Sequence, residues 1–157
     1  MKILSLDLGT KLGWCRSVDG EIIASGHEKF KSPFHWLSYR QFYEFLCRDI
    51  FSDYHIVIEK PNTFGPGYHS KRVLFGMLGI VELFFKPEQI TMISAKSAKK
   101  HMTGDGNASK EGMVASVCQT IGEEITSEDE ADAISFALFY WDTIHEKSNK
   151  VILKEII

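Results

Sequence analysis

The sequence has few cysteines, no excess of basic charge and no long apolar run. Its three cysteines, Cys15, Cys47 and Cys118, are widely spaced and form no C-x-x-C pair, so neither a zinc site nor a disulfide framework is indicated. The longest apolar stretch, residues 73–85, is interrupted by two glycines and a glutamate. It falls short of the ~20 apolar residues that a membrane span needs. These absences exclude disulfide-rich scaffolds and membrane-spanning proteins.

The N-terminal apolar run is broken by Asp7, too early for the apolar core of a secretory signal. We therefore expect a cytoplasmic protein. The formal net charge of −3 argues against a general polyanion binder, because nucleic-acid-binding proteins are usually basic overall.

The composition is that of an ordinary globular protein, with 44% hydrophobic and 25% charged residues. A chain of 157 residues fits one compact domain with a sizeable core. We expect this single domain to span residues 1–157.

The apolar patterns predict strands first and helices later. Asp19-Gly20 indicates a tight hairpin between two of the early strands, and Ser127 with Glu130 has the form of a helix capping box. The expected elements are strands over residues 2–8, 12–18 and 22–27, a helix over 33–51, a strand over 55–59, a helix over 73–85, a strand over 89–93, and helices afterwards, the last beginning near 127. This order predicts an α/β layer fold with a mixed sheet.

Four carboxylates fall at positions where they can converge. Asp7 lies in the first strand, Glu59 ends the fourth, and Asp129 and Asp132 are spaced i, i+3 on one helix face. Mg²⁺ and Mn²⁺ prefer hard oxygen ligands, and two such ions about 4 Å apart can support phosphodiester hydrolysis. Taken singly, each acid has an ordinary alternative as a turn former, a solvated strand end or a helix first-turn residue. Asp7 and Glu59, however, interrupt apolar strands, where a charge is costly unless a cation compensates it.

Three segments carry a resemblance to a known family. L-D-L-G-T at residues 6–10 followed by Gly13, I-E-K at 58–60, and D-E-A-D-A-I at 129–134 resemble the three acidic motifs of the RuvC-type Holliday junction resolvases. The order and spacing match over roughly residues 1–146, and D-x-x-D-A is the most specific piece.

The resemblance implies a ribonuclease H-like fold, with a mixed five-stranded sheet flanked by helices. It also implies that Asp7, Glu59, Asp129 and Asp132 are the catalytic acids and hold two Mg²⁺ or Mn²⁺ ions. The family cuts four-way DNA junctions as a homodimer, whose contact would correspond to residues 73–85. A phage-encoded branch of the family would be consistent with the short, slightly acidic chain, which would then work in the host cytoplasm.

The segment from residue 94 to 110 is locally basic, with four lysines against a single acid, Asp105. Such a patch can supply phosphate contacts even when the whole protein is slightly acidic. The alternative is a solvated helix face with a flexible loop. We interpret the segment as DNA-binding through Lys96, Lys99, Lys100 and Lys110.

The segment from residue 60 to 72 mixes aromatic and basic side chains, a combination that can stack on and hold unpaired bases. In the family it resembles, a loop here probes the junction centre. Phe64 is the nearest counterpart of the probing aromatic, with Tyr68 as the alternative. Phe64 packing under its own Gly-Pro-Gly loop is an equally good interpretation. The histidines show no ligand spacing, and none is assigned to catalysis.

Three alternative functions share some of these sequence features. A YqgF-type RNA-processing nuclease shares the opening motif, and a cleavage assay on junctions and RNA separates the two. An actin-like ATPase also has D-x-G-T, but it needs two large domains. A protein that binds branched DNA without cutting would be expected to lack metal acids, yet all four positions are acidic.

Overall fold

The computed structural model describes residues 1–30, 34–48, 51–61 and 67–145. Five strands form one sheet in the order β3-β2-β1-β4-β5. The strands are β1 (Lys2–Asp7), β2 (Lys11–Val18), β3 (Glu21–Lys29), β4 (Tyr54–Glu59) and β5 (Ile90–Ile93). The helices are α1 (His35–Arg48), α2 (Tyr68–Phe84), α3 (Ala95–Thr103), α4 (Lys110–Ile121) and α5 (Glu128–Phe139), with a 3₁₀ turn at Pro87–Gln89 and a π-helical turn at Tyr140–His145.

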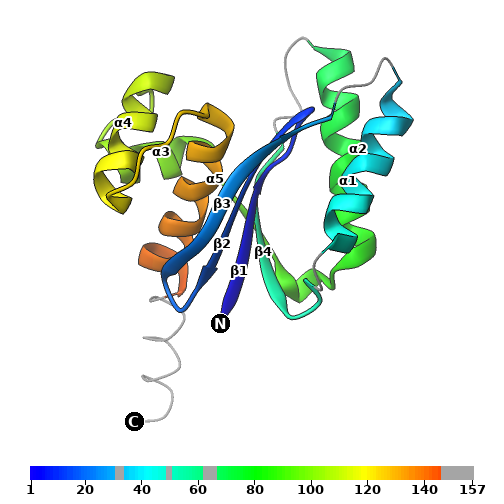
Figure 1. Cartoon of the computed structure of the whole chain (residues 1–157), viewed down its shortest axis with the longest axis horizontal. Helices are drawn as coiled ribbons and strands as arrows, with labels where there is room; N and C mark the ends of the chain where they lie inside the picture. The colour runs from blue at the N-terminus through cyan, green and yellow to red at the C-terminus, as the bar shows by residue number, and fades with distance from the viewer. Residues whose placement is uncertain (31–33, 49–50, 62–66, 146–157) are drawn as a thin grey trace.

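The sheet is mixed and covered on both faces. β1 and β2, and β2 and β3, are antiparallel, whereas β1 and β4, and β4 and β5, are parallel. Figure 1 shows α1 and α2 on one face and α3, α4 and α5 on the other. The predicted mixed five-stranded sheet flanked by helices is confirmed.

The two central strands are buried on both faces, as their unbroken apolar sequences predict. On β1, Leu4 and Leu6 pack with α1 and α2, while Ile3 packs with the C-terminal helices on the opposite face. On β4, Ile58 and Val57 divide between the same two cores. Asp7 and Glu59 stand where these apolar strands end.

The hairpin between β2 and β3 is confirmed. Asp19 and Gly20 have φ values of 50° and 92°, the left-handed conformation that a two-residue type I′ turn requires at both positions.

The helix α2 begins earlier than predicted. The sequence predicts a helix over residues 73–85, but the helix begins at Tyr68. Its first turn, Y-H-S-K-R, carries no apolar stripe, so the hydrophobic period indicates only the part of the helix from Val73 onward.

Two buried hydrogen bonds hold α5 and the π-helical turn that follows it against the sheet. The Ser5 hydroxyl donates to the Ala133 carbonyl over 2.7 Å, and the indole N–H of Trp141 donates to the Ser17 hydroxyl over 2.9 Å. Because Ser5 on β1 and Ser17 on β2 are both fully buried, the helix that carries Asp129 is held in a defined place over these two strands.

A Cβ on Gly76 would lie 2.4 Å from the ring of Tyr39, so this glycine of α2 accommodates an aromatic side chain of α1. Among the described residues, nothing lies within 4 Å of the Cβ position of Gly79.

None of the helices in the described ranges combines the length and apolar character that crossing a membrane requires.

Candidate metal centre

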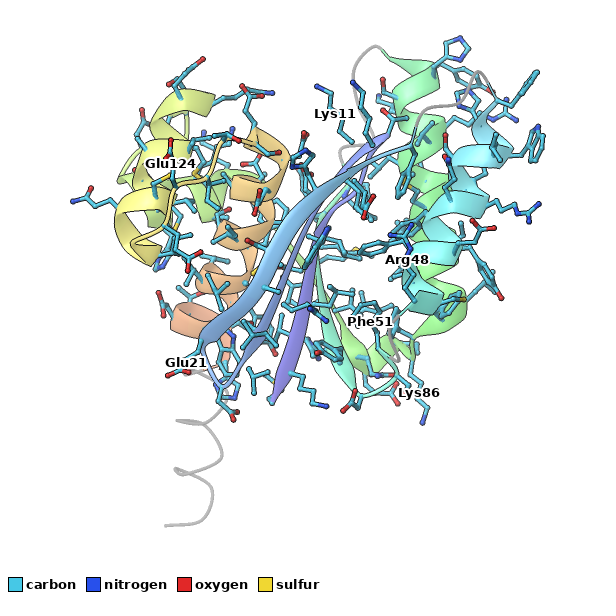
Figure 2. The ribbon with its side chains drawn as sticks, in the orientation of Figure 1. Lys11, Glu21, Arg48, Phe51, Lys86 and Glu124 are labelled. Carbon is cyan, nitrogen blue, oxygen red and sulfur yellow. The ribbon has the colours of Figure 1, made fainter. Side chains whose placement is uncertain are left out.

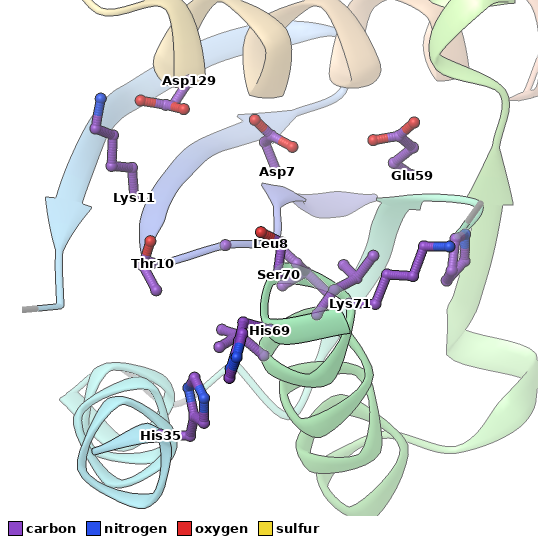
Figure 3. Close-up of a pocket in the computed structure, with 14 residues that line it drawn as sticks. Asp7, Leu8, Thr10, Lys11, His35, Glu59, His69, Ser70, Lys71 and Asp129 are labelled. Atoms are coloured by element: carbon purple, nitrogen blue, oxygen red, sulfur yellow. The ribbon is translucent and has the colours of Figure 1, made fainter. Parts of the chain in front are cut away.

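Strand pairing brings two of the four acids together. In the parallel pair of β1 and β4, Leu6 is aligned with Ile58, and the same offset sets Asp7 beside Glu59. In Figure 3 the carboxyl groups of Asp129, Asp7 and Glu59 lie along one side of the pocket, with Asp7 in the middle.

The start of α5 supplies the other two acids. The Ser127 side chain caps the helix by accepting a hydrogen bond from the Glu130 N–H over 3.3 Å, as the sequence predicts. The Glu130 carboxylate does not complete the reciprocal bond of a capping box but accepts a hydrogen bond from Ser25 over 2.7 Å. Asp129 and Asp132 lie on the first turn and a half of this capped helix.

Gly13 allows α5 to approach the sheet closely. It is the register partner of Asp7 on β2, and a Cβ there would lie 1.8 Å from the Asp129 carbonyl oxygen. The Asp129 backbone therefore rests directly on the strand beside Asp7. Sequence reasoning included Gly13 only as part of a motif.

A cleft of about 630 Å³ opens at this end of the sheet. Its wall includes Asp7, Glu59 and Asp129, together with Lys11 and residues from the starts of α1 and α2. The acids are therefore reachable from solvent through a space larger than a single ion.

The acids repel one another electrostatically. Burial raises the pKa of Asp7 from 3.8 to about 8, and the charges of Asp132, Glu59 and Asp129 add to the rise. Burial, together with the Asp132 charge, raises the pKa of Glu59. Burial also raises the pKa of Asp132, reinforced by Asp129 and Glu128 and opposed by Lys99 and Lys110. The protein has thus gathered negative charge that its own cations compensate only in part.

Within the described residues, no three acidic, histidine or cysteine side chains already converge on a point where a metal ion would sit. The donor set still fits a hard divalent cation: the groups are all carboxylates, and the most buried one carries a charge that is unfavourable without a cation.

The predicted DNA-binding lysines have different surroundings. Lys99 and Lys110 act on the acid cluster, since both lower the pKa of Asp132. The Lys110 ammonium also donates to Glu128 over 2.5 Å. Lys96 packs over Gly106, where an added Cβ would meet its Cγ at 2.8 Å. Lys100 is exposed on α3.

Phe64, the proposed junction-probing aromatic, lies outside the described residues. The alternative, Tyr68, is the first residue of α2 and is 72% exposed.

Sequence reasoning missed His35 and His69, whose rings lie 5.8 Å apart and which both line the cleft. Their positions 34 residues apart carry no local signal, because only the packing of α1 beside α2 brings them together.

We predict that the metal-free Asp7→Asn variant is more stable than the wild type at pH 8. The folded state holds the Asp7 proton more tightly than the unfolded chain, since its pKa is raised to about 8. Wild-type stability should therefore fall as the pH rises from about 4 to about 8. Asparagine has no such titration, so the variant should unfold roughly 5 to 10 °C higher at pH 8, a gain of about 2 to 3 kcal/mol.

Thermal unfolding in a chelating buffer between pH 5 and pH 9 measures this difference. The gap between the two proteins should widen with pH, and adding Mg²⁺ should raise the wild-type midpoint more than that of the variant. A gap that stays constant or reverses would show that Asp7 is not a buried acid under repulsion.

Known structures share this fold. A structure of RuvC from Thermus thermophilus aligns with a TM-score of 0.69 at 20% identity, covering 89% of this chain and 95% of that one. A T. thermophilus RuvC in complex with Holliday junction substrate aligns with a TM-score of 0.70 at 20% identity, covering 95% and 96%. No family model matches the sequence, and no curated protein matches it. The chain thus has the ribonuclease H-like fold of RuvC.

Proposed function

We propose that this protein is a metal-dependent endonuclease that cuts four-way and related branched DNA. The observation that carries the proposal is the group of four acids gathered at the ends of β1 and β4 and the start of α5. Burial and mutual repulsion leave their charge insufficiently compensated. The same fold is found in a RuvC structure that contains a Holliday junction substrate, which supports branched DNA as the ligand.

Asp7, Glu59, Asp129 and Asp132 would hold the cations, Mg²⁺ or Mn²⁺ and as many as two per site. Bound divalent cations would activate water for attack on the phosphorus and stabilise the leaving 3′ oxygen. Asp7 is central, because the other three acids all act on its pKa. A cation bound among the four acids would therefore interact directly with the Asp7 carboxylate.

The cations of the chain itself orient the substrate in this proposal. Lys99 lies near enough to lower the pKa of both Glu59 and Asp132, so its ammonium can face a phosphate brought to the acids. Lys96 and Lys100 on the same helix, and Lys110 beside Glu128, extend the contacts along the DNA backbone.

A homodimer through α2 completes the proposal, since paired cuts need two active sites. Phe75 and Leu83 on this helix are 43% and 86% exposed, and exposed large apolar side chains favour an interface. Sedimentation velocity of the wild type and of Leu83→Glu would test it: the charge should shift the protein towards the monomer, and a wild-type monomer would contradict the dimer.

Cleavage of a labelled synthetic four-way junction, with and without Mg²⁺ or Mn²⁺, tests the function. Linear duplex and structured RNA serve as comparison substrates. Paired symmetric cuts that need both the metal and the junction are the expected result. Cutting of RNA in preference would favour a YqgF-type processing nuclease, and junction binding without cutting under any metal would favour a non-cleaving binder.

A further inference from the structure

A second groove adjoins the acidic cleft, between the ends of β2 and β3 and the start of α5. It has a volume of about 500 Å³, and its wall includes Lys11, His27, Lys29, Ser127, Glu128 and Asp129. Lys11 and Asp129 line the acidic cleft as well. The two spaces therefore meet at these two residues, and a ligand in one can continue into the other.

Two lysines face each other across the strands at this groove. Lys11 and Lys29 are register partners on the antiparallel strands β2 and β3. The Phe30 N–H donates to the Thr10 carbonyl over 2.8 Å just beyond them, which fixes the pairing to the end of the ladder. Like charges directly opposite on neighbouring strands destabilise a sheet, so this arrangement carries a cost in the free protein.

Within the part of the chain that the structure describes, neither lysine is neutralised by a carboxylate. Among residues 1–30, 34–48, 51–61 and 67–145, no ion pair involves Lys11 or Lys29. Both residues are exposed. An anion placed between the two ammonium groups would relieve their repulsion.

The acids around the groove are already engaged. Glu128 accepts the hydrogen bond from Lys110. The Glu130 carboxylate lies 3.9 Å from Nδ1 of His27. It accepts a hydrogen bond from Ser25 and is mostly buried. Asp129 belongs to the metal-binding group proposed above. The Lys11 and Lys29 charges are therefore left to act on a ligand.

We propose that Lys11 and Lys29 bind backbone phosphates of the DNA strand that is cut, on the Asp129 side of the scissile phosphate. The inference rests on the proposed function for the identity of the strand. Lys99 lies on α3, which follows β5 at one edge of the sheet, whereas Lys11 lies on β2, on the other side of β1, beside Asp129 (Figure 3). The strand is thus held on both sides of the acids, which also explains how a chain of net charge −3 retains a polyanion.

The test compares the salt dependence of junction binding in chelating buffer for the wild type, the double variant Lys11→Gln/Lys29→Gln, and Lys86→Gln. Lys86 is an exposed lysine at the opposite end of the molecule (Figure 2) and serves as the matched control. Loss of two phosphate contacts should reduce the slope of log affinity against log salt by about 1.8. Between 50 and 200 mM salt, the double variant should lose roughly 12-fold less affinity than the wild type.

Single methylphosphonates placed next to the cleavage site locate the contact. Neutralising one phosphate on the Asp129 side should weaken the wild type and the Lys86 variant but not weaken the double variant further. A double variant with the wild-type slope, on a wild type that binds and cuts junctions, would overturn this inference and leave the proposed function standing. A wild type that binds no branched DNA would overturn both.

Discussion

Replacing Asp7 with asparagine is expected to reduce metal-dependent junction cleavage about a thousandfold or more, equivalent to roughly 4 kcal/mol of activation free energy. Asp7 lies between Glu59 and Asp129 in the cleft and feels the charge of the other three acids. An amide keeps the shape of the side chain but removes the charge that would hold a divalent cation. Junction affinity should change less than about threefold, because the lysines proposed to bind phosphates are untouched.

Single-turnover cleavage at saturating enzyme, with anisotropy binding on the same junction, separates the two effects. Asp132→Asn should behave like Asp7→Asn, whereas Glu124→Gln, an exposed acid in the loop between α4 and α5, should cut like the wild type. The unfolding midpoint of the metal-free Asp7 variant is the control for folding: a midpoint at or above that of the wild type excludes unfolding as the cause of lost cleavage. Cleavage near the wild-type rate in either aspartate variant would contradict the metal assignment.

The part of the fold that could be predicted from sequence is the part fixed by local patterns. β4 is a short β-branched run buried on both faces, and such burial leaves an almost uninterrupted apolar sequence. Asp7 and Glu59 are the first charged residues after the apolar residues of the two central strands. The end of each apolar run therefore identifies one acid of the cluster. The cap at Ser127 likewise marks the helix that carries Asp129.

The part that could not be predicted depends on contacts between distant segments. In the sequence, Lys11 and Lys29 are indistinguishable from ordinary surface lysines. Only the register of β2 and β3 shows that they lie opposite each other. The His35 and His69 pair arises from helix packing. The polar first turn of α2 is helical because the chain continues into an apolar helix, and propensity alone does not indicate where it starts.

Gly13→Ala is expected to have the second large effect, on structure and cleavage together. The added methyl would lie 1.8 Å from the Asp129 carbonyl oxygen and 2.3 Å from its carbonyl carbon. These are backbone atoms of a helix that buried hydrogen bonds hold to the sheet, so they cannot move aside as a flexible side chain would. Either α5 lifts from β2 or the strand bends, and both separate Asp129 from Asp7. We expect a loss of about 3 kcal/mol in stability, the upper end of the usual 1–3 kcal/mol cost of overpacking, because the atoms that the methyl meets are rigid.

Chemical denaturation and junction cleavage of the same preparations measure the two consequences. Gly112→Ala is the matched control, because its Cβ would meet only the Ser109 hydroxyl, at 3.4 Å, and alanine favours a helix over glycine by about 1 kcal/mol. Gly112→Ala should therefore be at least as stable as the wild type. If Gly13→Ala folds with lowered stability, its cleavage should fall at least tenfold below that of the wild type under conditions where both are folded, since a displacement of about 1 Å in a positioned group can cost a hundredfold in rate. Wild-type stability and cleavage in Gly13→Ala would show that close contact between β2 and α5 does not set the position of Asp129.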